Sequence, residues 1–361
     1  MAPALGGRAA EPVYRPVLAG RRGELEALAH LDPALAPLLA PVIDVHAVDA
    51  CTLDLLGRLP PGLLPAVDVS ALPDGPESEP ARWGVPLVPV LGLADGDRRL
   101  VAHGVAARAH GRAVVRLRTG RDRAGPDATT GAVERVWRLT GLVPEQCDLL
   151  IDAGDVCCPA DVRLAGPRVR RLADWGRRHA WRSVTVAAGG MPPAVGRLPA
   201  DEPVRLDRFD WRLWRDLADL DVGYGDYGVG CAAPAAEDVP GDRLPTLRYT
   251  TDGAWWIYRW SRRGGRGDER CADLCRTLVA APWWPTAGAG FSWGDHEILR
   301  RARRGAGAGS PSSWVAWSTS HHLAHVLAAL HPDREQRGGP WRAGPERRTG
   351  RAPRGESRRA G

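Results

Sequence analysis

The 361-residue chain contains no lysine, and phenylalanine and methionine occur only twice each. Apart from histidine, every basic residue is therefore arginine, while alanine, glycine and proline are abundant. This mixture is typical of codon bias in a GC-rich genome, so we draw no functional conclusion from it. With 44% hydrophobic residues, the chain has the composition of an ordinary globular protein.

Several features that would assign a functional class are missing from the sequence. No stretch approaches the roughly 18 consecutive apolar residues of a membrane span, and residues 1–12 lack the apolar core of a signal peptide. No Gly-x-Gly-x-x-Gly follows an early strand, and no Walker loop, hydrolase nucleophile elbow or His-Glu-x-x-His zinc motif occurs. We therefore expect no membrane partner, and the sequence indicates no metal and leaves the cofactor unknown.

The seven cysteines do not form a metal-binding pattern. Cys157 and Cys158 are adjacent, and Cys271 and Cys275 lie one helical turn apart without the second pair that a zinc site needs. An odd number of cysteines and the absence of a secretory leader favour a reducing compartment. We expect a cytoplasmic protein.

The basic charge of the chain is concentrated at its C-terminal end. The formal net charge is +6, and residues 332–361 contain nine arginines and four acidic residues, so the remainder is almost neutral. We interpret residues 332–361 as a disordered Arg-rich tail and residues 1–12 as a flexible N-terminus. Such a tail can make non-specific contact with nucleic acid, and the alternative is a merely solvated end.

Apolar strands alternate with amphipathic helices along the rest of the chain. After an extended run at 14–18, we predict strands at 42–48, 66–70, 85–93, 113–118, 148–152, 183–188, 221–228 and 246–250, with 255–260 extending or following the last. We predict helices at 21–31, 52–59, 101–110, 131–140, 169–180, 210–220, 268–280, 295–303 and 322–330. This α/β pattern predicts a (β/α)8 TIM-barrel-like fold forming a single domain over residues 13–331. An open doubly wound sheet is the alternative.

In such a barrel the loops after the strands form the site, so polar residues near the strand ends are the candidates. They are Asp44, His46, Asp68, Arg116, Arg118, Asp152, Asp155, Asp226, Tyr227, Arg248 and Tyr249. Asp152 and Asp226 are interpreted as a base or metal ligands, and the alternative for each is a turn or capping aspartate. We expect the ends of the strands carrying Asp226 and Arg248 to be neighbours that face Asp152.

Cationic and phenolic residues complete the candidate site. Arg248 lies within a predicted strand, where it must meet an anionic ligand or pair internally with Asp226 or Asp152. Arg116 and Arg118 share one strand face, which either binds an anion or points outward to the helices.

Tyr227, Tyr249 and His321 could orient a ligand or act as an acid, and a packing role is the alternative for the histidine. The predicted catalytic residues are Asp152, Asp226, Tyr227 and His321. Arg116, Arg248, Tyr249 and Asp44 are predicted to bind the substrate.

Short motifs in a fixed order give the chain a resemblance to a known family. They are Tyr14–Leu18, Gly23-Glu24, Pro41–Val45, Leu150–Asp152, Gly225–Gly228, Arg248–Thr250, Gly294-Asp295 and His321–Leu323. On these motifs, residues 14–325 resemble the phage-associated beta protein family of bacteria and phages. The resemblance implies a TIM-barrel-like fold, a binding role for Glu24 and a link to phages, mobile elements or defence. It implies no established reaction.

The sequence departs from the family pattern at two positions. Ala19 stands where the family carries a lysine, and Val315 stands where it carries an arginine. Our first hypothesis is a barrel that binds an anionic small molecule, phosphate-bearing or nucleotide-like, at its mouth, with hydrolysis as its catalytic version. The alternative is a non-catalytic interaction protein with a protein partner in a phage-linked system.

Overall fold

The computed structural model describes residues 14–120, 126–233, 244–261, 267–303 and 307–331. The predicted flexible N-terminus and the predicted Arg-rich tail both lie outside these residues. None of the helices in the described ranges has the length and apolar character needed to cross a membrane.

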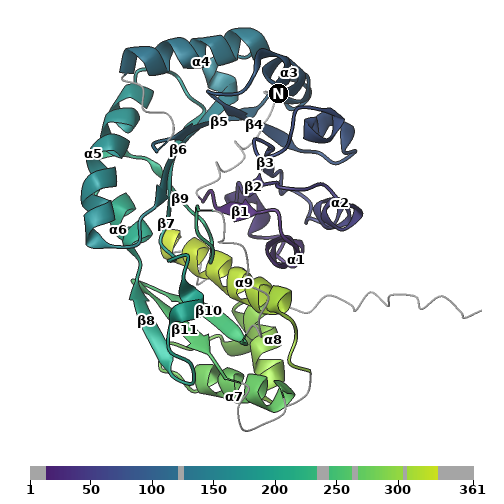
Figure 1. Ribbon diagram of the computed structural model, residues 1–361, viewed down its shortest axis with the longest axis vertical. Helices are drawn as coiled ribbons and strands as arrows, with labels where there is room; N and C mark the ends of the chain where they lie inside the picture. Colours follow the sequence, from purple (N-terminus) through teal and green to yellow (C-terminus); the bar gives the residue numbers. More distant parts are fainter. Residues whose placement is uncertain (1–13, 121–125, 234–243, 262–266, 304–306, 332–361) are drawn as a thin grey trace, which may run out of the picture.

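Eight parallel strands of the described chain form a ring in sequence order (Figure 1). They are β1 (Val17–Ala19), β2 (Val42–Asp44), β3 (Ala66–Asp68), β4 (Val88–Gly92), β5 (Ala113–Arg118), β6 (Cys147–Asp155), β7 (Ser183–Gly189) and β9 (Gly223–Asp226). Each strand pairs with the next, without the reversal of strand order that a doubly wound sheet has. The predicted barrel is confirmed.

The ring is closed next to β1 by a short bridge between distant parts of the sequence. Tyr14 pairs in parallel with Tyr224 of β9, and the backbone N–H of Arg15 donates to the carbonyl oxygen of Tyr224 over 3.0 Å. The segment before β1 therefore forms the contact that makes the barrel nearly closed.

The two faces of each strand pack against different layers, as β5 illustrates. Ala113, Val115 and Leu117 pack in the cluster between the barrel and its helices. Val114 belongs to the cluster inside the barrel. Because side chains alternate along a strand, Arg116 and Arg118 share the inner face with Val114. Of the two orientations open to these arginines, the structure shows the inward one.

Seven helices of the described chain surround the barrel (Figure 1). They are α1 (Arg22–Ala29), α2 (Ala50–Gly57), α3 (Asp97–His110), α4 (Pro126–Thr140), α5 (Pro159–Gly176), α6 (Phe209–Arg215) and α9 (Pro311–Leu330). Two short 3₁₀ turns, Pro76–Ser78 and Pro80–Arg82, lie between β3 and β4.

Helix α9 is longer than the helix predicted at 322–330. It begins at Pro311, which suits a first helical position, and the Ser310 side chain caps it by accepting from Ser313 N. It packs tightly on α1, where a Cβ added to Gly23 would lie 2.6 Å from the Ser312 carbonyl oxygen.

A second, three-stranded antiparallel sheet lies beside the barrel, in the order β10 (Thr246–Thr251), β11 (Ala254–Arg259) and β8 (Pro203–Asp207). Two further helices, α7 (Gly267–Val279) and α8 (Trp293–Ala302), accompany it. The prediction that 246–250 forms the last barrel strand is therefore wrong. Thr251 faces Ala254 across an Asp252-Gly253 turn, and such a turn joins antiparallel neighbours. Asp226 and Arg248 do not lie on paired strands, contrary to our expectation.

Candidate functional site

A cavity of about 1370 Å³ lies at the carboxyl ends of the barrel strands. Its lining comes from the ends of β1, β2, β3, β5 and β6 and from the loop after β9. Residues of β10, β11 and the first turns of α9 line it as well. The cavity is therefore bounded both by the barrel mouth and by the antiparallel sheet. Parallel barrels commonly place their active sites at this end.

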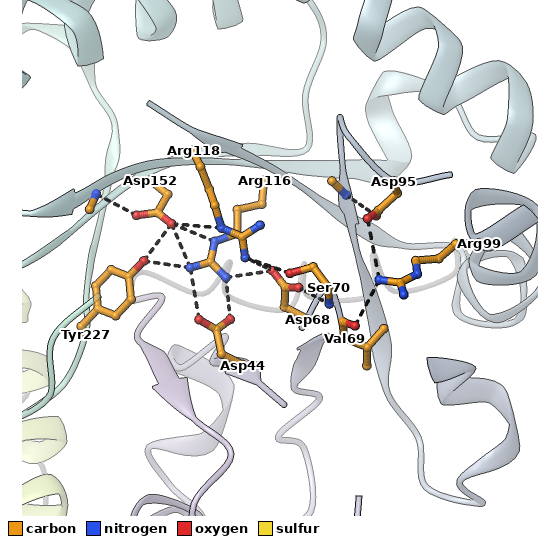
Figure 2. A network of polar contacts seen from close by, with 12 residues as sticks. Asp44, Asp68, Val69, Ser70, Asp95, Arg99, Arg116, Arg118, Asp152 and Tyr227 are labelled. Atoms are coloured by element: carbon orange, nitrogen blue, oxygen red, sulfur yellow. Dashed lines mark hydrogen bonds and ion pairs between the residues drawn. The ribbon is translucent and has the colours of Figure 1, made fainter. Parts of the chain in front are cut away.

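Arg116 gathers three carboxylates on one side of the cavity (Figure 2). Its Nη1 donates to Asp68 Oδ2 over 2.8 Å and also to Asp44, and its Nε donates to Asp152 Oδ2 over 2.9 Å. These aspartates end β2 and β3 or lie within β6, so the parallel strands deliver them to one place. Arg116 is only 2% exposed, and all three of its nitrogens are engaged.

Tyr227 and Arg118 extend this cluster. The Tyr227 hydroxyl accepts from Arg116 Nη2 and donates to Asp152 Oδ2, each over 2.8 Å. Arg118 Nη2 donates to Asp68 Oδ2 over 2.7 Å. Asp152 Oδ1 also accepts from the Gly154 backbone N–H, so Asp152 is a turn-capping aspartate as well as a cavity residue.

The charges of the cluster stabilise one another. Burial opposes ionisation of Asp68, but Arg116 and Arg118 outweigh it and hold the pKa of that carboxyl below its ordinary value. Burial raises the pKa of Asp44, although Arg116 opposes this. Burial also acts against the Arg116 charge, yet Asp152 and Asp44 raise the pKa of the guanidinium overall. Burial and Asp152 raise the pKa of Tyr227, which keeps its proton for donation.

Arg248 has a different environment. It lines the cavity from β10 and is partly buried, and its Nη1 donates to the Val229 carbonyl oxygen over 2.8 Å. Among the described residues, no carboxylate lies within ion-pair distance of it, so neither internal pair considered for Arg248 forms. Burial lowers the pKa of this guanidinium.

Glu24 lines the cavity from α1 and is 5% exposed. Its Oε2 has no hydrogen-bond partner within the described part of the chain. Burial raises the pKa of Glu24 from 4.5 to about 8, with Arg21, the Ala19 backbone N–H and Arg248 opposing the shift. A carboxyl group of this kind keeps its proton at neutral pH and can donate a hydrogen bond.

Three predicted site residues do not line this cavity. Asp226 is buried beneath the end of β9 and accepts from Tyr14 and Tyr224 over 2.6 and 2.8 Å, with His322 Nε2 2.8 Å away. Tyr227 lines the cavity and Asp226 does not, because consecutive residues at a strand end point to opposite faces.

Tyr249 and His321 meet a different carboxylate. Tyr249 donates to Asp295 Oδ1 over 2.7 Å, and His321 Nδ1 lies 3.0 Å from Asp295 Oδ2. This buried group joins β10, α8 and α9. The side chains of Asp226, Tyr249 and His321 do not line the cavity. The catalytic role of Asp226 and His321 and the binding role of Tyr249 therefore stay predictions.

Three further arginines of the cavity, Arg21, Arg197 and Arg259, were not among the predicted site residues. Arg21 directly precedes α1, and the other two belong to the segments around the antiparallel sheet, which the sequence did not reveal as a wall of the site. Asp68 and Asp155 also line the cavity, and their positions near strand ends did signal this. Across the described ranges, no group of three His, Cys, Asp or Glu side chains is arranged to hold a metal ion.

Comparison with known proteins places the chain in a family. No curated protein matches it. Among solved structures it is similar to the triosephosphate isomerase of Bartonella henselae, with 15% sequence identity and a TM-score of 0.32, over 60% of this chain and 91% of that one. The family model described as Beta protein matches residues 63–328. The chain therefore belongs to the Beta protein family.

Proposed function

We propose that this protein binds an anionic small molecule in the barrel-mouth cavity, and that the ligand is phosphate-bearing or nucleotide-like. The observation that carries the proposal is Arg248, a partly buried guanidinium in the cavity without a carboxylate partner among the described residues. A buried charge is costly unless it is paired. An anion in the cavity would supply the missing partner, and a guanidinium suits phosphate geometry.

The surroundings of Arg248 support the same ligand class. Arg21, Arg197 and Arg259 line the cavity with it, whereas Arg116 is already committed to three aspartates. The first residues of α9, Pro311 and Ser312, also line the cavity. The amino end of a long helix carries a partial positive charge that adds to the attraction for an anion.

Hydrolysis of the bound ligand is the catalytic version of this proposal. Asp152 and Tyr227 meet at the cavity wall, where the carboxylate would orient a water molecule and the phenol would donate a proton. Asp152→Asn should then abolish turnover of a phosphate ester while retaining binding of the ester. A variant that keeps both turnover and binding would argue against a hydrolytic site.

Calorimetric titration with sulfate and with ADP at low ionic strength tests the binding proposal. Replacing Arg248 with Ala should weaken both ligands by at least about tenfold, since a hydrogen bond to a charged group contributes about 1.5–3 kcal/mol. Arg205→Ala is the matched control, because Arg205 is an exposed arginine of the same sheet that pairs with Asp207 outside the cavity. Equal affinity in the Arg248 variant, or no binding by the wild type, would overturn the proposal.

A further inference from the structure

We propose that Glu24 holds the bound anion as a protonated carboxyl group, donating a hydrogen bond to it, so that the anion and one proton bind together. This inference rests on the proposed anion binding and adds a specificity residue and a pH dependence to it. It starts from an acidic side chain placed where an anion is expected to bind. An ionised carboxylate there would repel the ligand, so the protonation state of Glu24 decides whether the site works.

The position of Glu24 is fixed by the packing of α1. The preceding residue, Gly23, lies so close to α9 that an added Cβ would be 2.6 Å from Ser312 O and 3.0 Å from Val315 Cβ. This contact holds the first turn of α1 against the first turn of α9 at the edge of the cavity. Glu24 is thus presented to the cavity by a rigid contact between two helices.

The groups facing Glu24 come from several elements. Arg21 precedes α1, Arg248 lies in β10 and Asp44 ends β2, and all three influence its carboxyl group. Cys231, in the loop after β9, is also close enough to interact with it. None of these described groups hydrogen-bonds Oε2, and Arg248 donates to the Val229 carbonyl oxygen instead. An ionised Glu24 would be expected to pair with Arg248, so this arrangement fits the neutral acid.

The neutral acid and Arg248 complement each other as hydrogen-bond donors to one anion. Arg248 has five N–H groups, of which the structure shows one nitrogen engaged, and a protonated Glu24 adds an O–H. A bound negative charge favours the protonated form of Glu24 further, because it lies beside the carboxyl group. By linkage, the proton then strengthens anion binding as much as the anion strengthens proton binding.

Sulfate is the probe for this coupling, because its charge does not change between pH 6.5 and pH 9. Titration calorimetry in two buffers of different ionisation enthalpy gives the affinity and the number of protons taken up. The pKa of Glu24 in the protein without a bound anion is about 8. We therefore expect sulfate binding to take up almost no proton at pH 6.5 and close to one proton at pH 9. The affinity should fall about tenfold between these pH values.

Two variants of α1 separate Glu24 from general effects of pH. Glu24→Gln keeps a donor in the form of its amide, so it should bind sulfate as the wild type does at pH 6.5 and retain that affinity at pH 9. Glu26→Gln changes a residue of the same helix that does not line the cavity, and it should keep the wild-type pH dependence.

The outcomes distinguish this inference from the function on which it rests. Wild-type binding with equal affinity at both pH values and no proton uptake would overturn the role of Glu24 and leave anion binding intact. Glu24→Gln with the wild-type pH dependence would do the same. Absence of sulfate binding at pH 6.5 would overturn both proposals. Absence of proton uptake by the wild type at pH 9 overturns the role of Glu24 even if the variant does not fold.

Discussion

Arg116 and Glu24 line the same cavity but differ in how their charge is compensated. Arg116 stays charged because Asp44, Asp68 and Asp152 surround it. Glu24 has no such partner for its buried oxygen, and its pKa rises to about 8. One residue is stabilised by ion pairs and the other by keeping its proton, so substitutions at the two positions should affect stability in opposite directions.

Arg116→Gln should lower the free energy of unfolding by about 3–5 kcal/mol at pH 7, because three carboxylates lose their counter-charge. Burial disfavours the charged forms of Asp44 and Asp68, so without Arg116 the pKa values of these two carboxyls rise, they take up protons as the pH falls, and the deficit shrinks toward pH 5. Urea unfolding of both proteins at pH 7 and pH 5 measures the difference. Arg58→Gln, which breaks an exposed pair with Asp54, is the control and should change little. A deficit that is equal at both pH values would contradict this account.

Glu24→Gln should have the opposite effect. The pKa of Glu24 in the folded protein lies above its ordinary value. Keeping this carboxyl group buried therefore does not lower the free energy of unfolding below about pH 4.5, and the loss of stability grows as the pH rises to about 8. The variant avoids this cost, so its advantage over the wild type should be near zero at pH 4.5 and approach about 4–5 kcal/mol at pH 8 as an upper limit. Unfolding midpoints across this pH range test the trend. A variant that is less stable than the wild type at pH 8 would contradict it.

Among the elements, α8 and α9 pack without room for a side chain at Gly294. A Cβ there would lie 2.1 Å from the Trp317 carbonyl oxygen, which is far inside van der Waals contact. Gly294→Ala should therefore destabilise the protein by roughly 1–3 kcal/mol or more, as overpacking does. Gly131→Ala is the control of opposite sign. Gly131 lies exposed inside α4 with nothing near its Cβ position, so alanine should stabilise by about 0.5–1 kcal/mol. Thermal unfolding of the two variants gives the comparison.

The sequence predicted the elements well where hydrophobic pattern alone determines them. Residues 113–118 formed the predicted strand, because both faces of that segment are buried. Prediction from the sequence failed where turns and tertiary contacts decide which strand a segment pairs with. The segment 246–250, which is rich in residues that favour strands, resembles a barrel strand, and only the Asp252-Gly253 turn indicates that it pairs with 254–259 instead. Strand β8 was missed because it is short and half exposed, with little apolar pattern.

The candidate site shows the same division. Asp44, Arg116, Asp152 and Tyr227 meet because parallel strands bring their carboxyl ends together, which the strand pattern implies. Arg248 reaches the cavity for a reason that the pattern did not contain, namely the position of the antiparallel sheet. Asp226, Tyr249 and His321 were grouped with them by sequence position, but strand alternation and sheet membership place them in other buried networks.

For the whole molecule, the cavity joins the barrel to the antiparallel sheet, since both contribute to its lining. A bound anion should therefore stabilise both parts together. At a sulfate concentration one hundred times the Kd, we expect about 2.7 kcal/mol of added stability. Differential scanning calorimetry should show one transition that moves to higher temperature with sulfate. Two transitions, of which only one moves, would mean that the sheet unfolds independently of the ligand.

The contact that closes the barrel also sets the order in which the protein can fold during synthesis. Tyr14 needs Tyr224 to close the ring, and its hydroxyl lies 3.0 Å from His322, 308 residues away. A ribosome must therefore deliver β9 before the segment around Tyr14 has its strand partner, and most of α9 before the Tyr14 hydroxyl has its histidine partner. Until β9 is available, this segment is an open edge that other chains can pair with. Slowing translation before residue 226 should prolong this state and increase the dependence of the nascent chain on chaperones.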